Sequence, residues 1–193
     1  MKTTLSFVLL AIAPFAVSAQ SAEPLPSAVQ VAAAVLPLPA QYRQDATVLG
    51  YQAGKKELVS LRAGKNPYIC LADDPADDRF HVACYHNSLE PFMLRGRELR
   101  AQGVTNVDSA RYAEINSGKL KMAPGPAALF SLTARGKPDA TGVTPGGRPL
   151  YVLYVPFATA ESTGLPTTAP GANTPWLMMP GTPKAHIMFT PTM

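Results

Sequence analysis

The sequence has little of what enzymatic and metal-binding sites are usually made from. It contains two cysteines, three histidines and one tryptophan in 193 residues. No Gly-x-Ser-x-Gly motif, Cys-x-x-Cys pair or Gly-x-x-x-x-Gly-Lys-Ser/Thr loop occurs in it, so the usual signatures of serine hydrolases, redox-active thiols and phosphate-binding loops are absent. The sequence therefore contains no motif that identifies an activity.

Charged residues are also scarce. Asp, Glu, Lys and Arg make up 16% of the chain, and the formal net charge is +4. The basic residues occur in scattered pairs such as Lys55-Lys56 and form no dense run, whereas nucleic-acid sites need a concentrated basic surface. We therefore do not expect the protein to bind nucleic acid.

Residues 1–19 have the pattern of a secretory signal peptide. Lys2 supplies the positive charge, an apolar run continues to Val17, and small residues form a cleavage site at residues 17–19. No later stretch has the ~20 consecutive apolar residues that a membrane-spanning helix requires. The sequence predicts a secreted or periplasmic protein, as bacteria export, with no membrane span once the signal is removed.

Export determines how the two cysteines are interpreted. In an oxidising compartment a pair of thiols forms a disulfide by default, and Cys70 and Cys84 lie in two strand-like segments on either side of an acidic turn. We therefore predict a disulfide between Cys70 and Cys84. A loop of this size gives roughly 3 kcal/mol of stability in the chain-entropy model, and opposed cysteines also fix the register of the hairpin.

The chain after the signal divides into two parts. Residues 20–41 are rich in alanine and proline and almost uncharged, which predicts an extended tether. Residues 42–193 have the length of a single domain. Because the predicted helices of this domain are bracketed by strands, the predicted fold class is α+β.

Four alternating segments at the start of the domain predict an antiparallel β-meander with helices packed on one face. One later segment, residues 150–155, is apolar at both odd and even positions, which predicts a central strand buried on both faces. The predicted strands in chain order are residues 46–51, 57–62, 67–72, 80–86, 129–132, 150–155 and 185–190.

One well-capped helix is predicted at residues 89–102, with Ser88 as the N-cap and Gly103 at its end. Gly96 falls within the apolar arc of this helix, so we expect the helix backbone to approach the sheet closely there. A shorter second helix is predicted around residues 111–115, capped by Asp108 or Ser109.

Two long Pro- and Gly-rich segments, residues 136–149 and 163–183, predict irregular loops in the C-terminal half. The second contains Trp176, which is expected to pack down as a lid over the sheet edge. The alternative interpretation is that Trp176 and the neighbouring methionines line a ligand pocket.

Three polar residues form the candidate catalytic site that the sequence offers. His86 and Glu90 flank Ser88, and the distant His186 could converge with them, giving the His-Glu-His set found in catalytic zinc sites. The preferred interpretation is that each histidine is a partly buried hydrogen-bonding residue. We therefore expect no metal and no cofactor.

The function most consistent with these observations is an exported, non-enzymatic binding or interaction domain whose partner is an unidentified protein or small molecule. The absence of a catalytic motif and the rigid disulfide scaffold favour it. Two alternatives remain open: a histidine-dependent hydrolase, metal-assisted or not, and a component of a cell-envelope assembly.

The acidic turn between the cysteines generates the first prediction. Asp73, Asp74, Asp77 and Asp78 offer clustered oxygens to calcium, but Pro75 splits the cluster and no glutamate closes a calcium loop. We expect added calcium to leave the melting temperature unchanged in differential scanning calorimetry. An increase of Tm with calcium concentration would show a bound ion.

Overall fold

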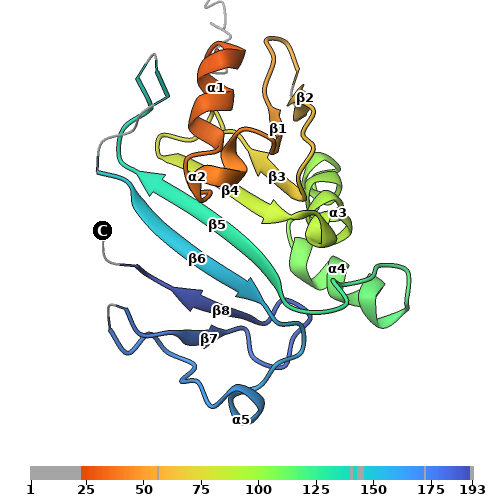
Figure 1. The fold of residues 1–193 in the computed structure, drawn as a ribbon. Helices are drawn as coiled ribbons and strands as arrows, with labels where there is room; N and C mark the ends of the chain where they lie inside the picture. Colours follow the sequence, from red (N-terminus) through yellow and green to blue (C-terminus); the bar gives the residue numbers. More distant parts are fainter. Residues whose placement is uncertain (1–22, 56, 140, 143–145, 172, 192–193) are drawn as a thin grey trace, which may run out of the picture.

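The computed structural model describes residues 23–55, 57–139, 141–142, 146–171 and 173–191. The predicted signal peptide lies outside the described residues. The chain forms a mixed eight-stranded sheet in the order β2-β1-β3-β4-β5-β6-β8-β7, with helices on both faces (Figure 1). The strands are β1 Thr47–Gly50, β2 Val59–Arg62, β3 Tyr68–Leu71, β4 Phe80–His86, β5 Ala127–Ala134, β6 Arg148–Tyr154, β7 Trp176–Met178 and β8 His186–Phe189.

Five α-helices and one 3-10 turn complete the described chain. They are α1 Ser27–Ala34, α2 Ala40–Arg43, α3 Glu90–Ala101, α4 Val107–Asn116, α5 Ala160–Thr163 and the turn Asn87–Leu89. α1 packs on the β1 and β4 part of one face, and α3 and α4 contribute to the core on the other face. The helices are thus bracketed by strands, as the sequence predicts.

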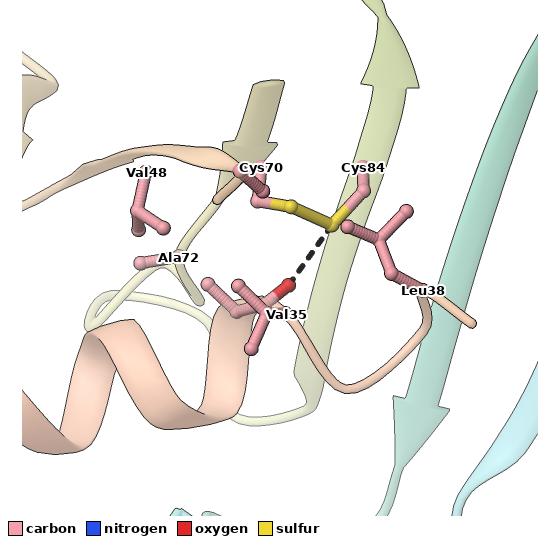
Figure 2. Packing of buried hydrophobic residues seen from close by; sticks show 8 residues of the cluster. Val35, Leu38, Val48, Cys70, Ala72 and Cys84 are labelled. Atoms are coloured by element: carbon pink, nitrogen blue, oxygen red, sulfur yellow. Dashed lines mark hydrogen bonds between the residues drawn. A yellow bond between two sulfur atoms is a disulfide. The ribbon is translucent and has the colours of Figure 1, made fainter. Parts of the chain in front are cut away.

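The hairpin of β3 and β4 is confirmed, including its disulfide. Cys70 lies directly opposite Cys84 in the antiparallel ladder, and the two form a disulfide. Both cysteines are fully buried in a cluster with Val48 and with the end of α1 (Figure 2). The Sγ of Cys84 lies 3.1 Å from the carbonyl oxygen of Ala34. Because a disulfide sulfur carries no hydrogen, this is a close contact and no hydrogen bond.

The predicted four-stranded meander is wrong at its first strands, because β1 pairs in parallel with β3 and antiparallel with β2 on its other side. The turn after β2 wraps around the start of β1. Its backbone N–H groups at Lys65 and Asn66 donate to the Asp45 carbonyl at 2.8 and 3.0 Å. A Cβ on Gly64 would lie 2.2 Å from the nitrogen of Thr47, so only glycine allows this crossing.

The predicted tether is also wrong for the part of it that the structure describes. Residues 27–34 form α1, and Ala34 and Leu38 are at most 1% exposed within the disulfide cluster. The buried Gln30 side chain joins α1 to β1. Its Nε2 donates to the carbonyls of Leu25 at 2.6 Å and Tyr51 at 3.0 Å, and its Oε1 accepts from the Tyr51 N–H at 2.9 Å.

Both predicted helices are present, with different caps. The N–H of Ser88 donates to the imidazole of His86, and α3 then begins at Glu90. α4 is longer than predicted, and Asn106 caps it by accepting from the Ser109 N–H. The capping acceptors thus lie two to three residues before the predicted ones, His86 in place of Ser88 and Asn106 in place of Asp108 or Ser109.

Gly96 makes room for a neighbouring side chain and not for the sheet, which corrects the sequence-based expectation. A Cβ at this position would lie 2.8 Å from the Arg111 guanidinium. Arg111 comes from α4, lies 3.8 Å above the ring of Phe92, and donates to the Phe92 carbonyl at 3.1 Å. The glycine therefore serves the packing of α3 on α4.

The segment around Trp176 packs against the sheet edge as a paired strand. Trp176 pairs with Met188 and Leu177 with Ile187, so that β7 becomes the last strand of the sheet. Trp176 is 9% exposed and Leu177 is fully buried. The segment therefore covers the sheet edge, as expected. The expectation of irregular structure is wrong for residues 176–178, which form a strand.

The position of Gln30 generates the second prediction. Replacing Gln30 with leucine removes three hydrogen bonds and leaves the Tyr51 N–H without this partner, so we expect a loss of about 2–4 kcal/mol in the free energy of unfolding. Urea denaturation measures it. The matched control is Gln41→Leu on α2, where the side chain is exposed and the expected change is below about 0.5 kcal/mol. Equal effects would show that α1 is a dispensable tether.

Candidate functional site: the open aromatic face

The two faces of strands β5, β6 and β8 are covered unequally. Leu129, Val152 and Met188 align across these strands and pack in the cluster with α3. Side chains alternate between faces along a strand, so the next residues, Phe130 and Tyr151 on β5 and β6, point to the opposite face. Figure 1 shows no helix in front of this second face over β5, β6 and β8 among the described residues.

This arrangement overturns the prediction that residues 150–155 form a central strand buried on both faces. β6 is sixth in the sheet order, and only one of its faces is well covered. Val152 and Tyr154 are 8% and 7% exposed, whereas Tyr151 is 40% exposed. The odd and even positions of this strand are both apolar because one set faces the core and the other set forms an open apolar face. β4 is the strand with the most buried residues.

The open face carries an aromatic row, which we define as Tyr42, Tyr68, Phe130, Tyr151 and Phe189. The ring centroids of Tyr42 and Tyr68 are 5.1 Å apart, those of Tyr68 and Phe130 5.9 Å, and those of Phe130 and Tyr151 5.3 Å. Phe189 continues the row because it lies opposite Tyr151 in the ladder. The row thus crosses the sheet from α2 to β8.

The outer half of the aromatic row borders a shallow groove of about 460 Å³, which is within the size range of small-molecule and peptide sites. Most of its lining is apolar, and no charged side chain belongs to it within the described chain. Asn173 and Thr190 add polar groups at its edge. The apolar lining consists chiefly of Ala128, Phe130, Tyr151, Leu153, Phe189 and Pro191.

The inner half of the aromatic row rests on the core. Tyr68 and Phe130 are partly buried and pack against the disulfide cluster, and Phe130 lies directly opposite Cys84 in the ladder. The rings are therefore held by a covalently closed hairpin on one side and by the ladder on the other. Burial, followed by repulsion from Tyr42 when both phenols are ionised, raises the pKa of Tyr68, so this hydroxyl stays protonated at neutral pH.

His86, a sequence-predicted candidate, lies beside the aromatic row. It is opposite Tyr68 in the ladder, and the two rings meet edge to face at 6.1 Å. The backbone N–H of Ser88 donates to the Nδ1 of His86 at 3.2 Å. Since Nδ1 accepts this hydrogen bond, the neutral imidazole carries its proton on Nε2, and His86 can donate from that atom.

Glu90 lies on the opposite side of the sheet, where it forms hydrogen bonds with Tyr85 and Arg97. The Tyr85 hydroxyl donates to it at 2.5 Å, Arg97 donates to its other oxygen at 2.6 Å, and Arg97 also donates to the Tyr85 hydroxyl at 2.9 Å. Burial first, and then the hydrogen bond to Glu90, raise the pKa of Tyr85 well above its usual value. This set stabilises the packing of α3 on β4.

His186 lies on the face opposite to His86. Its ring stacks on Tyr154 at 5.3 Å, and its Nδ1 donates to the Lys184 carbonyl at 2.7 Å. β4 and β8 are three neighbours apart in the sheet, which corresponds to roughly 14 Å at the usual strand spacing. The structure therefore does not bring His86, Glu90 and His186 together, and no cluster of three or more metal-ligating side chains occurs among the described residues.

The acidic turn is closed around a lysine from the same chain. The Nζ of Lys137 donates to the Asp73 carboxylate at 2.6 Å and to the carbonyls of Asp77 at 2.6 Å and Asp74 at 3.2 Å. The other oxygen of Asp73 accepts from the His81 N–H at 2.7 Å, so Asp73 also joins the two arms of the hairpin. A cavity of about 180 Å³ lies beside this pair, and Glu23 is the third charged residue of its lining.

No helix in the described part of the chain is long and apolar enough to cross a membrane. Comparison of the chain with protein-family models, with curated proteins and with solved structures gave no match. The site therefore has to be judged by its own geometry and chemistry.

Sequence reasoning missed the aromatic row because its members come from five separate segments. The signal that could have found it is the apolar character of residues 150–155 on both parities. In a sheet with helices on only part of one face, such a strand exposes one apolar row, and the facing strands β5 and β8 carry phenylalanines at the matching positions.

The burial of His186 generates the third prediction. Burial lowers its pKa, so the unfolded chain binds the proton more tightly than the folded chain. Stability is then complete above the unfolded pKa of about 6.5 and is lost as the pH falls below it. We expect the free energy of unfolding to decrease from about pH 7.5 to about pH 5, and to decrease less in His186→Gln. Identical pH profiles of the two proteins would contradict this.

Proposed function

We propose that the protein is an exported, non-enzymatic binding domain that holds an uncharged ligand on the open aromatic face. The observation that carries this proposal is the row of rings left exposed on a rigid sheet: Tyr42, Tyr151 and Phe189 are 37%, 40% and 39% exposed. Contiguous apolar surface on a soluble protein usually marks a binding site.

The scaffold beneath the row supports binding over catalysis. The disulfide and the α1 cluster hold Tyr68 and Phe130 from below, so the rings are positioned before a ligand arrives. A preorganised surface loses little conformational entropy on binding. The absence of charge in the groove lining favours a ligand that is neutral along the contacting stretch, because burying an unpaired charge is costly.

The arrangement of the three candidate residues favours binding over the hydrolase alternative. Glu90 is bound by Tyr85 and Arg97, and His86 and His186 lie on opposite faces of the sheet. The second alternative, a cell-envelope component, is compatible with the proposal, because the open face suits a partner protein as well as a small ligand. Export itself is supported by the disulfide and by the predicted signal peptide.

The fourth prediction tests the proposed function with indole, a neutral aromatic probe, in a nitrogen-15 NMR titration of the purified protein. We expect shifts of the backbone amides of residues 128–131, 151–153 and 187–190, because a planar apolar ring can pack against the exposed rings. Tyr151→Ala and Phe189→Ala should each weaken these shifts severalfold. The matched control is Phe157→Ala, which removes a ring that is 52% exposed and lies outside the groove lining. Indole binding elsewhere, or none, would refute the proposal.

A further inference from the structure

Three arginines gather at one end of the sheet, where β4 and β6 begin and β5 ends (Figure 1). His81, Thr133 and Arg148 lie side by side there, because Thr133 pairs with His81 in one ladder and with Arg148 in the next. Arg79 directly precedes β4, and Arg135 directly follows β5. We define these five residues as the basic corner.

The strand residues of the basic corner lie on the face of the sheet that α3 covers elsewhere. Residues an even number of positions apart in a strand share a face, and each of the three is four positions from a residue of the cluster packed with α3, namely Tyr85, Leu129 and Val152. Four positions measure ~13 Å along a strand. His81 and Arg148 are exposed, so they lie beyond the covered part of this face, opposite the aromatic row.

The arginines of the basic corner are free to bind a ligand. Arg79, Arg135 and Arg148 are exposed, and within the described chain their side chains form no hydrogen bond and no ion pair. Asp77 in the preceding turn contacts Arg79 through the backbone N–H, at 3.1 Å. Even if Asp77 and Asp78 offset two of the three charges, the corner keeps a positive excess.

The row across the strands adds neutral donors between the charges. The Thr133 hydroxyl lies between His81 and Arg148, and neither this hydroxyl nor the imidazole has a hydrogen-bond partner in the part of the chain that the structure describes. The imidazole offers an N–H donor in either protonation state. His81 and Arg148 are two strand steps apart, ~9.6 Å, so both long side chains can reach one group above Thr133.

The number and kind of these donors indicate a tetrahedral oxyanion. One arginine fork already satisfies both oxygens of a carboxylate, whereas a phosphate monoester carries up to two charges and three free oxygens that point in different directions. Guanidinium, hydroxyl and ring N–H groups arriving from three strands match the second shape. Three arginines correspond to one phosphate group, while a nucleic-acid surface contacts many.

We propose that the basic corner binds one phosphate group, free or esterified, through the guanidinium groups of Arg79, Arg135 and Arg148 and the hydroxyl of Thr133. This site goes beyond the proposed function and does not depend on it, because it uses other residues on the opposite face. Both faces can therefore be occupied at the same time.

The experiment is a nitrogen-15 NMR titration of the purified protein with sodium phosphate at constant pH, compared with sodium chloride at equal ionic strength. We expect phosphate-specific shifts at residues 79–82, 132–135 and 148. The dissociation constant should lie between about 0.3 and about 10 mM, because exposed charge pairs are weak. Arg148→Gln and Arg135→Gln should each raise it about fivefold, the loss of one such contact, and Thr133→Val about twofold.

The matched control is Lys121→Gln, which removes one positive charge from an exposed lysine ahead of β5. The start of β5 is ~23 Å from the end that carries the basic corner, so this variant should leave the dissociation constant unchanged. Equal weakening by Lys121→Gln and Arg148→Gln would show that only net charge matters, and would overturn the site.

Two other results would also overturn the inference. The first is the absence of any phosphate-specific shift at the basic corner. The second is an equal response of the same amides to acetate, because the site would then take carboxylates as readily as a tetrahedral anion. Sulfate, which is also tetrahedral and doubly charged, should shift the same amides as phosphate.

Vesicles distinguish the source of the phosphate group. Cosedimentation with vesicles that contain phosphatidic acid, but not with pure phosphatidylcholine vesicles, would assign the site to a lipid headgroup if Arg148→Gln abolishes it. Binding of inorganic phosphate without cosedimentation would assign it to a soluble phosphate ester. Either result supports the basic corner as a phosphate site.

Discussion

The pairing of β3 with β4 through the Cys70–Cys84 disulfide is the constraint on which the rest of the structure depends. It places both sulfurs on the face that α1 covers, so the N-terminal helix gains a closed apolar surface to pack on. The separate ladder between β4 and β5 places Phe130 opposite Cys84. The disulfide hairpin is thus shared by the first core cluster and the inner half of the aromatic row.

The open face follows from the dimensions of the elements. Eight strands at the usual spacing make a sheet roughly 34 Å wide, whereas a helix with its side chains covers only about 10–12 Å. α3 and α4 contribute to the core on one face, while α1 and the single turn of α2 lie over the β1 to β4 part of the other. β5, β6 and β8 extend beyond them, and the residues on their open face include Phe130, Tyr151 and Phe189.

Most of the charged groups near the core are paired within the chain, which limits what the protein can do chemically. Glu90 is bound by Arg97, Asp108 is bound by both Lys184 and Arg111, and Asp73 is bound by Lys137. Although burial alone would raise the pKa of Asp108, hydrogen bonds from Lys184 and Arg111 keep it below its usual value. Such pairs stabilise the fold.

The sequence by itself determined the local features: the hairpin of β3 and β4, its disulfide, the two helices after it and the order of the later strands. These depend on alternation, capping residues and cysteine chemistry, which act over a few residues. The parallel pairing of β1 with β3, the burial of α1 and the contact of Gly96 with Arg111 were decided only by the tertiary structure. The tertiary structure also decided the aromatic row, because its rings meet through pairing between segments far apart in the chain. The sequence pattern of an apolar strand is the same whether a helix covers its face or leaves it exposed.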